Sequence, residues 1–382
     1  MARSAHAYIR GNTAKFYEWL AGLKADQLPQ GPSIWVCGDC HIGNLGPIAS
    51  AEGEVQIQIR DLDQTVIGNP AHDVVRLGLS LAASARGSNL SGVTTAKMLE
   101  QLIEGYAWAL NGGSADKELG KKDPKSFRDL MHLAESRSWK QLAKDRIENT
   151  DPTIPLGKRF WPVSRQERRE IENLFQGPDM WRLATLLRSR DDKASVKVLD
   201  TAYWLKGCSS LGRLRFAVLL GIEDKPGKIA DYCLMDVKEA VKAAAPRDVK
   251  AKMPRDNGQR IIEGARQLSP YLGERMRAAR LLDRSVFIRE LRPQDMKPEI
   301  GRLSQEEAVK LARFLGAVVG GGHARQMDRL TRAAWGKECS RNRSKKLHAP
   351  SWLWCSVVEV LERHEGAYLE HCRKYALDQP AG

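Results

Sequence analysis

The 382-residue sequence contains no apolar run that approaches the roughly 20 residues a membrane-spanning helix needs. Aromatic residues make up only 7% of the chain, and no recognised nucleic-acid-binding motif occurs, which argues against a dedicated nucleic-acid-binding module. The first residues lead into a polar, charged stretch without the apolar core of a signal peptide. Seven cysteines, an odd number in no disulfide-like pattern, favour a reducing cytoplasm.

Positive charge is what the chain has in excess. The formal net charge is +14, which favours anionic partners such as a nucleotide, a phosphorylated metabolite or a nucleic acid, although a merely basic surface is the alternative. Hydrophobic residues account for 42% and charged residues for 28%, as in soluble globular proteins. The length is sufficient for two or three lobes with sizeable cores.

The most informative segment is residues 37–44, Cys-Gly-Asp-Cys-His-Ile-Gly-Asn, which follows a short apolar run that reads as a buried strand. In phosphoryl transfer, an aspartate such as Asp39 can accept the proton of the attacking hydroxyl, and an asparagine such as Asn44 can bind Mg²⁺. Asp61, beyond the next predicted strand, would complete the metal site, because Mg²⁺ prefers oxygen ligands and keeps several waters. Asp63 is a candidate ligand of a second metal ion, or a candidate positioning residue.

The same segment resembles the His-Gly-Asp-x-His-x-x-Asn loop of aminoglycoside phosphotransferase-like kinases, with Cys37 in place of the first histidine. Asp61-Leu62-Asp63 is similar to the metal-binding segment that follows in those kinases. The stretch 69–73, Asn-Pro-Ala-His-Asp, is similar to the segment whose aspartate braces their catalytic loop. The resemblance therefore implies a catalytic role for Asp39, a bracing role for Asp73, and ATP and Mg²⁺ as cofactors.

A closer resemblance, over most of the chain, is to an uncharacterised bacterial family called domain of unknown function 2252. The family name implies no function. Residues 4–11 are one of the matching stretches, and they make Arg10 a candidate phosphate contact. The alternative is that Arg10 is an ordinary residue on a helix surface. The other matching stretches are residues 37–44, 61–65, 73–77 and 236–240.

Cys37, Cys40 and His41 also spell Cys-x-x-Cys-His, the attachment pattern of c-type haem, which requires export to an oxidising compartment. A redox pair or half of a zinc site are further readings of the two cysteines. No second close cysteine pair exists in the sequence. The simplest interpretation is that Cys37 and Cys40 are two partly buried free thiols beside a functional loop.

Residues 195–300 have the pattern of a kinase small lobe, with strands predicted at 195–200, 213–220, 232–237 and 286–291. The second of these strands follows a glycine and serine loop that would approach phosphates through its backbone N–H groups, and Lys238 at the end of the third would bind phosphate oxygens. Glu263, on a helix predicted over 257–272, is the expected ion-pair partner of Lys238. The loop residues expected at the nucleotide are Gly207, Ser209, Ser210 and Gly212.

The order of these parts is the reverse of that in kinases, where the glycine loop and lysine precede the catalytic aspartate. We therefore predict an α+β, two-lobed, protein-kinase-like fold with circularly permuted order, which is permitted when the original ends lie close together. Residues 1–194 and 301–382 would form the large helical lobe, and residues 195–300 the small lobe. Helices are predicted at 4–23, 73–110, 305–323 and 352–375, and over 126–190 with breaks near Asp151-Pro152 and Gly177-Pro178. Loops are predicted at 112–125 and 335–348.

The predicted function is ATP- and Mg²⁺-dependent phosphoryl transfer to a hydroxyl of a small-molecule or protein substrate. Three alternatives stay open at this point. The first is a catalytically inactive or nucleotidyl-transferring kinase-like regulator, the second is a basic nucleic-acid-binding protein, and the third is a haem or thiol redox protein.

Overall fold

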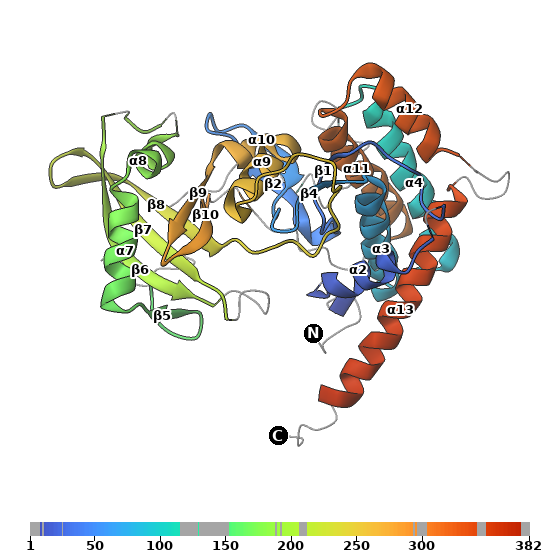
Figure 1. Ribbon diagram of the computed structural model, residues 1–382, viewed down its shortest axis with the longest axis horizontal. Helices are drawn as coiled ribbons and strands as arrows, with labels where there is room; N and C mark the ends of the chain where they lie inside the picture. The colour runs from blue at the N-terminus through green and yellow to red at the C-terminus, as the bar shows by residue number, and fades with distance from the viewer. Residues whose placement is uncertain are drawn as a thin grey trace.

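The computed structural model describes residues 8–9, 11–24, 26–114, 129, 153–187, 189–191, 193–205, 212–292, 295, 304–341 and 349–375. Figure 1 shows a molecule with a β-sheet at one end and a group of long helices at the other, joined by a middle region of short strands and short helices. The α+β class predicted from the sequence is confirmed.

The sheet is antiparallel and six-stranded, in the order β5-β6-β7-β8-β10-β9. One face carries Phe216, Val218 and Leu220 of β7, which alternate along the strand and are buried beneath α7 (Arg165–Phe175) and α8 (Pro178–Thr185). The strands are β5 (Phe160–Pro162), β6 (Ser195–Trp204), β7 (Arg215–Lys225), β8 (Lys228–Glu239), β9 (Met276–Leu281) and β10 (Arg284–Glu290). The opposite face, because successive side chains alternate, carries Arg215 and Lys238.

The helical end is held together by unusually close packing between α4 (Gly92–Leu110) and α11 (Gln305–Ala324). A Cβ atom at Gly316 would lie 2.1 Å from the carbonyl oxygen of Leu102, so glycine is required at this crossing. Around this pair lie α2 (Thr13–Ala21), α3 (Ala71–Gly87), α12 (Arg329–Cys339) and α13 (Ser351–Tyr375).

The middle region contains two small antiparallel sheets and two helices. The strand β1 (Ile34–Val36) pairs with β4 (Val66–Gly68), and β2 (Leu45–Ala49) pairs with β3 (Val55–Ile59). A short 3-10 turn, η1 (Ile42–Asn44), precedes β2. The helices α9 (Asn257–Leu268) and α10 (Pro270–Glu274) follow the sheet strand β8 in sequence, but their buried side chains belong to the same hydrophobic core as the long helices.

Several local predictions differ from the structure. The helix predicted over 73–110 is two helices, α3 and α4, because Asn89 adopts a positive φ of 56° and Ser91 begins a new helix by accepting a hydrogen bond from the Thr94 amide. The loop predicted over 335–348 begins as the end of α12. Residues 115–128 and 342–348, where further loop was predicted, lie outside the described residues.

The hydrophobic cores divide the chain differently from the boundary expected at residue 194. β5, α7 and α8 precede that boundary, yet β5 is the edge strand of the six-stranded sheet. The helices α7 and α8 pack on the same sheet, where Ile171 and Phe175 are buried against its strands. Conversely, Ile261 and Ile262 of α9 join the core of the helical end.

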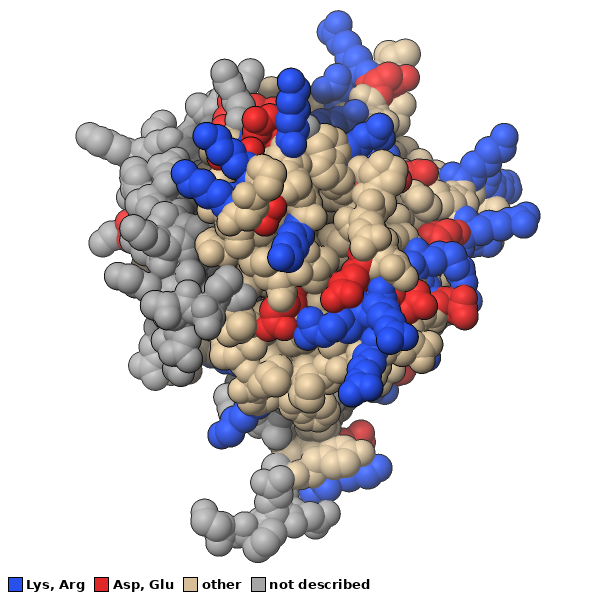
Figure 2. All heavy atoms as spheres, turned by 90° about the vertical axis from the view of Figure 1, so that its left-hand side faces the viewer, with Lys and Arg blue, Asp and Glu red and all other residues tan. Residues whose placement is uncertain are grey.

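No helix in the described part of the chain is long and apolar enough to cross a membrane. Figure 2 views the molecule from the sheet end, with acidic side chains lying among basic ones on that face. The excess of positive charge is therefore not gathered into a broad patch of one sign on this face.

Candidate active site at the 37–44 loop

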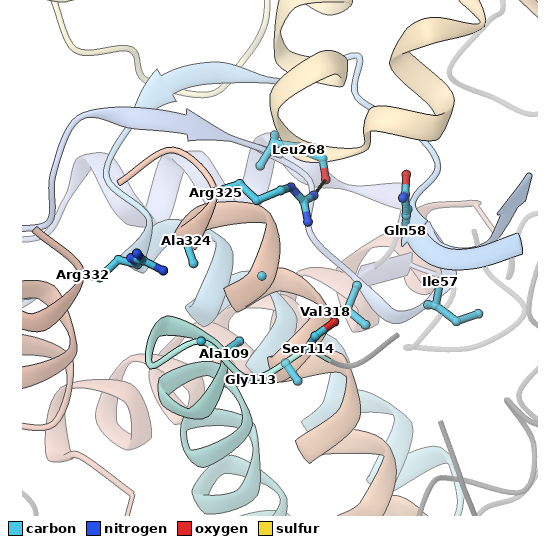
Figure 3. Close-up of a pocket in the computed structure, with 13 residues that line it drawn as sticks. Ile57, Gln58, Ala109, Gly113, Ser114, Leu268, Val318, Ala324, Arg325 and Arg332 are labelled. Atoms are coloured by element: carbon cyan, nitrogen blue, oxygen red, sulfur yellow. Dashed lines mark hydrogen bonds between the residues drawn. The ribbon is translucent and has the colours of Figure 1, made fainter. Parts of the chain in front are cut away.

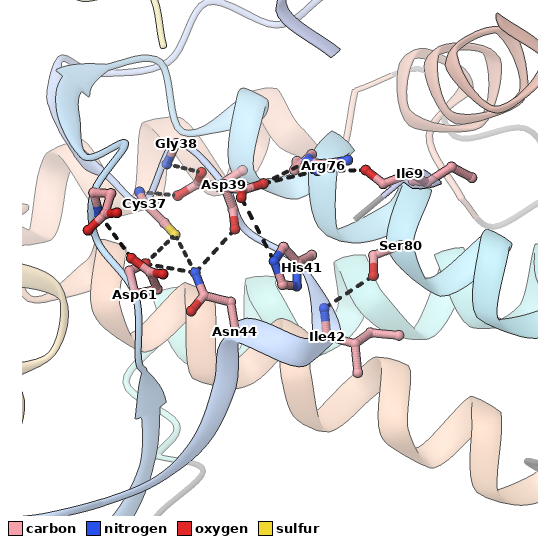
Figure 4. Close-up of polar contacts among 12 residues, drawn as sticks. Ile9, Cys37, Gly38, Asp39, His41, Ile42, Asn44, Asp61, Arg76 and Ser80 are labelled. Carbon is pink, nitrogen blue, oxygen red and sulfur yellow. Dashed lines mark hydrogen bonds and ion pairs between the residues drawn. The ribbon is translucent and has the colours of Figure 1, made fainter. Parts of the chain in front are cut away.

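The 37–44 loop leaves β1 in a turn that depends on Gly38. Gly38 has a φ of 76°, and a Cβ atom there would lie 2.2 Å from the carbonyl oxygen of Gln64. The amides of Cys37 and Gly38 donate to the two carboxylate oxygens of Asp73 at 2.6 and 2.9 Å (Figure 4). Asp73, at the start of α3, thus holds the loop backbone, in the position that the sequence assigned to a brace.

Asp73 is itself held by a line of buried polar groups that runs into the helical end. His323 Nε2 lies 3.2 Å from its Oδ2, and Nδ1 of the same ring lies 2.8 Å from the Tyr106 hydroxyl. Trp335 Nε1 donates to that hydroxyl at 2.9 Å. Helices α3, α4, α11 and α12 therefore all contribute to the position of the loop.

Asp39 is a loop residue with a partly exposed carboxylate. Its side chain keeps 23% of its area exposed, whereas the side chain of its partner Arg76 keeps 1%. Arg76 donates to Oδ1 of Asp39 from Nε at 3.1 Å and from Nη2 at 3.0 Å, and also binds the carbonyl of Ile9. His41 Nε2 lies 3.8 Å from Oδ2 (Figure 4). One carboxylate oxygen thus binds arginine, and the other lies at ion-pair distance from His41.

Asn44 ties the loop to the acidic segment 61–63. Its amide nitrogen donates to the carbonyl of Asp61 at 2.7 Å and to that of Asp39 at 3.3 Å, and lies 3.6 Å from the Cys37 sulfur. These contacts use only the nitrogen of the amide, so the oxygen remains as a potential metal ligand.

Lys238 reaches the acidic segment from the sheet. Its ammonium group forms an ion pair with the carboxylate of Asp63, 175 positions away in sequence. Lys238 lies opposite Arg215 on β7 and Phe287 on β10, on the sheet face that α7 and α8 leave uncovered. The structure therefore brings Asp39, Asn44, Asp61, Asp63 and Lys238 into one region.

The charged groups in this region shift one another's pKa values. Burial raises the pKa of Asp63, and the neighbouring charge of Asp61 raises it further. Burial also opposes ionisation of Asp61, but Lys238 and Arg289 outweigh it and lower the pKa of that carboxyl. Burial disfavours the charged form of Lys238, yet the two aspartates raise its pKa. The two adjacent carboxylates therefore share the positive charges of Lys238 and Arg289.

Two further basic residues lie near the acidic segment, and neither was predicted from the sequence. Arg289 of β10 donates to the carbonyl of Arg60 at 2.8 Å. Arg215 binds Asp236 through two hydrogen bonds of 2.9 and 2.6 Å. Arg215 and Arg289 lie beside Lys238 and Asp61 around a small cavity of about 20 Å³. An arginine inside an otherwise apolar strand is a sequence signal for a buried charged group. The partner of each arginine depends on how the strands pair, which the sequence alone does not show.

Glu263 does not form the ion pair expected of it. It is exposed on α9, and Lys238 binds Asp63 instead. The side chain that α9 directs at the acidic segment is Arg260, which donates to the carbonyls of Asp63 and Thr65.

The predicted glycine loop is described only at its end. Gly212 is exposed, with a φ of 75°, in the turn before β7. Arg10, Gly207, Ser209 and Ser210 lie outside the described residues.

The two loop cysteines are free and buried. The hydrogen bond to Cys40 and burial together raise the pKa of the Cys37 thiol, which disfavours the reactive thiolate form.

The site residues suit Mg²⁺ held jointly with phosphate better than an all-protein metal cage. Within the described ranges, no group of three or more His, Cys, Asp or Glu side chains could hold a metal ion. Oδ1 of Asp63 is buried without a hydrogen-bond partner, and it lies beside Asp61. One or two carboxylates together with substrate phosphates and water are the usual protein environment of Mg²⁺.

Comparison with known proteins gives the family but no activity. The chain belongs to the family described as "Uncharacterized protein conserved in bacteria (DUF2252)", whose model matches residues 1–374. No curated protein and no solved structure matches the chain. The resemblance to this family noted in the sequence is confirmed.

Proposed function

We propose that this protein is an ATP- and Mg²⁺-dependent phosphotransferase that acts on a hydroxyl group of a small-molecule or protein substrate. The observation that carries the proposal is the ion pair of Lys238 with Asp63, beside Asp61. In the kinase-like pattern, Lys238 is assigned to phosphate and the acidic segment 61–63 to metal. The ion pair brings these two parts together, although they lie far apart in sequence. A fold that serves only stability gains little from burying such a charged group, because the desolvation of each ion costs several kcal/mol.

The residues would divide the work as follows. Asp39 accepts the proton of the attacking hydroxyl through the carboxylate oxygen that Arg76 does not bind, and Asp73 holds the loop that carries it. Asn44 and Asp61 bind Mg²⁺, which neutralises the charge that develops on the phosphates. Lys238 leaves Asp63 to bind phosphate oxygens, and Asp63 then supports the metal.

A permuted kinase-like order is part of the proposal. The sheet with Lys238 would correspond to a small lobe, and the helical end to a large lobe. The rings of Tyr8 and Tyr368 lie 5.8 Å apart, so the segment before β1 runs beside α13. Joining these two segments and opening the chain before β6 restores the usual kinase order, which supports permutation.

A second candidate is a nucleotide-binding regulator without phosphotransfer activity. The ion pair between Arg76 and Asp39 favours it, because the arginine already binds the carboxylate that would have to act as the proton acceptor. This candidate shares the nucleotide site and differs only at Asp39.

Nucleotide binding is tested by the melting temperature of the full-length protein with ATP and Mg²⁺. We expect an increase of a few degrees, since a ligand at one hundred times its Kd adds about 2.7 kcal/mol to the folded state. Lys238→Ala should diminish the increase, and Asp61→Ala should remove its dependence on Mg²⁺. Lys242→Ala, at an exposed position four residues after Lys238 in the chain, serves as the matched control. No increase at millimolar ATP would contradict both candidates.

A further inference from the structure

The loop between β8 and α9, residues 240–256, contains no helix or strand, and the structure describes all of it. Loops of this length without secondary structure of their own are uncommon in compact domains, and those that are ordered are usually functional. Figure 1 shows the loop running out from the sheet across the middle region and back to α9. Its second half carries four exposed cations, Arg247, Lys250, Lys252 and Arg255, which we call the basic loop surface.

Hydrogen bonds hold this loop against β4 and against the residue that precedes β1. The amide of Asp248 donates to the carbonyl of Ile67 at 2.8 Å, and the hydroxyl of Ser33 donates to the carboxylate of Asp248. The amide of Ala244 donates to Oε1 of Gln64 at 2.7 Å. Because the backbone of the loop is already fixed, less conformational entropy is lost when a partner binds to it.

The fold itself does not use the charges of the basic loop surface. None of its four side chains forms a hydrogen bond or an ion pair with another described residue. The carboxylate that lies among them in sequence, Asp248, accepts hydrogen bonds from the Ser33 hydroxyl and from the Lys250 amide. That carboxylate is therefore engaged in holding the loop.

Arginines elsewhere in the structure differ, because they bind groups of the fold. Arg325 lines the cavity drawn in Figure 3 and donates to the carbonyl of Leu268 at 2.9 Å. Arg190 binds the carboxylate of Glu290 on β10 at 2.7 Å. The basic loop surface is therefore suited to a partner from outside the chain.

The composition of the loop favours an acidic polypeptide over a nucleic acid. Residues 240–256 contain no aromatic side chain on which a base could stack, and no asparagine or glutamine that could pair with adenine. Lysine and arginine bind carboxylates as opposite charges. Val249, which is 84% exposed among these cations, adds an aliphatic contact that suits a side chain of a peptide.

We propose that the basic loop surface docks an acidic segment of a protein and so presents a nearby hydroxyl of that protein to the 37–44 loop. From Ser33, which contacts the docking loop, β1 leads to Cys37 over about 13 Å. An extended peptide covers this distance with about four residues, so the acceptor serine or threonine should lie at about that spacing from the acidic segment. The role in substrate recognition rests on the phosphotransferase proposed above, whereas the docking itself does not.

The test is fluorescence anisotropy of the full-length protein with a labelled octaglutamate peptide, at low ionic strength and without nucleotide or Mg²⁺. The comparison probes are octaglutamine and a single-stranded oligonucleotide of the same charge as octaglutamate. We expect octaglutamate to bind more tightly than either, and its affinity to fall in about 1 M salt, because exposed charges are then screened. Equal or tighter binding of either comparison probe, or no binding of octaglutamate at millimolar concentration, would overturn the proposal.

Two double variants assign the binding to this loop. Lys250→Glu/Lys252→Glu should weaken octaglutamate binding roughly tenfold or more, because two attractive contacts become repulsive. The matched control is Lys225→Glu/Lys228→Glu, which makes the same change of charge at exposed positions of β7 and β8 and should leave binding nearly unchanged. Both proteins should keep the melting temperature of the wild type, since all four side chains are exposed. Equal loss of binding in the two variants would show attraction to the net charge alone and refute the docking surface.

The melting temperature with ATP and Mg²⁺ separates the docking surface from the proposed nucleotide site. Lys250→Glu/Lys252→Glu should retain the increase caused by nucleotide, and loss of that increase would assign the loop to the nucleotide site and overturn the proposal. Octaglutamate binding by a wild-type protein that does not respond to ATP would refute the phosphotransferase and support the docking surface. A response to ATP without octaglutamate binding would refute the docking surface alone.

Discussion

At the scale of single residues, the candidate site is organised by an ion pair at Asp39 and by hydrogen bonds of Asn44 and Asp73. Arg76 binds one oxygen of Asp39, and the second lies near His41 on a side chain that is partly exposed. Asn44 uses its amide nitrogen for backbone contacts and retains its oxygen. Both carboxylate oxygens of Asp73 accept hydrogen bonds from the loop backbone, so Asp73 positions the loop and does not act in the chemical step. This division of labour is what makes Asp39 the informative residue to change.

Asp39→Asn retains the size of the side chain and an oxygen for Arg76, but it removes the proton acceptor. General-base catalysis typically contributes on the order of 10²–10⁴-fold, so phosphate transfer from ATP to a metabolite mixture should fall by about that factor. ATP binding, measured by calorimetry, should change little, because Asp39 faces the acceptor and not the nucleotide in the proposed arrangement. Asp224→Asn, at an exposed position on β7, is the control.

The outcomes of that experiment separate the two candidate functions. Equal loss of binding and transfer in Asp39→Asn would refute the role given to Asp39. A wild-type protein that binds ATP, modifies no acceptor and hydrolyses nothing would favour the regulator.

At the scale of elements, the α4–α11 contact determines how the helical end is assembled. Gly105 on α4 and Gly316 on α11 let the two backbones meet directly, since a Cβ atom at either position would lie about 2 Å from an opposing carbonyl oxygen, at 2.0 and 2.1 Å respectively. The same two helices carry Tyr106 and His323, so this packing also aligns the polar line that ends at Asp73.

Gly316→Ala should therefore destabilise the protein by about 1–3 kcal/mol in urea unfolding, because the helices must separate to admit the methyl group. Gly321→Ala, five residues further along α11, meets no atom within 4 Å. There alanine should be neutral or add up to about 1 kcal/mol through its better helix propensity. Similar effects of the two substitutions would contradict close packing at Gly316.

At the scale of the whole molecule, buried ionisable groups link stability to pH. Burial lowers the pKa of His72, at the start of α3, from 6.5 to about 4. Between these values the unfolded chain binds a proton that the folded protein does not, so stability falls as pH decreases through this window. The contribution is complete above pH 6.5 and disappears towards pH 4.

His72→Gln should flatten this part of the stability curve. The difference between variant and wild type should change by at most about 3 kcal/mol from pH 7 to pH 4. The measurement is urea unfolding at several pH values, and His371→Gln on α13 serves as the comparison. A parallel displacement of the two curves over the whole range would show that His72 does not titrate as argued.

Features that depend on neighbours in sequence could be predicted without the structure. The boundaries of α11 and α13, the strands at β1 and β3, and the break at Gly177 follow from apolar periodicity and turn residues, which are local signals. The family membership follows from the motifs around residues 37–44 and 61–65. The interruption at Ser91 between α3 and α4 was missed, because a capping serine inside an apolar pattern is a weak signal.

The sequence by itself determined the α+β class, the family and the identity of the residues with chemical potential, because those depend on composition and short spacing. Only the tertiary structure decided which of them meet. Lys238 binds Asp63 and not Glu263, because the register of β8 and the rotation of α9 direct those side chains, and neither is encoded locally. Arg289 and His323 reach the site in the same way, through contacts between segments far apart in the chain. Partner choice among buried charges is a property of packing, since each charge must find an opposite charge where the assembled backbone places it.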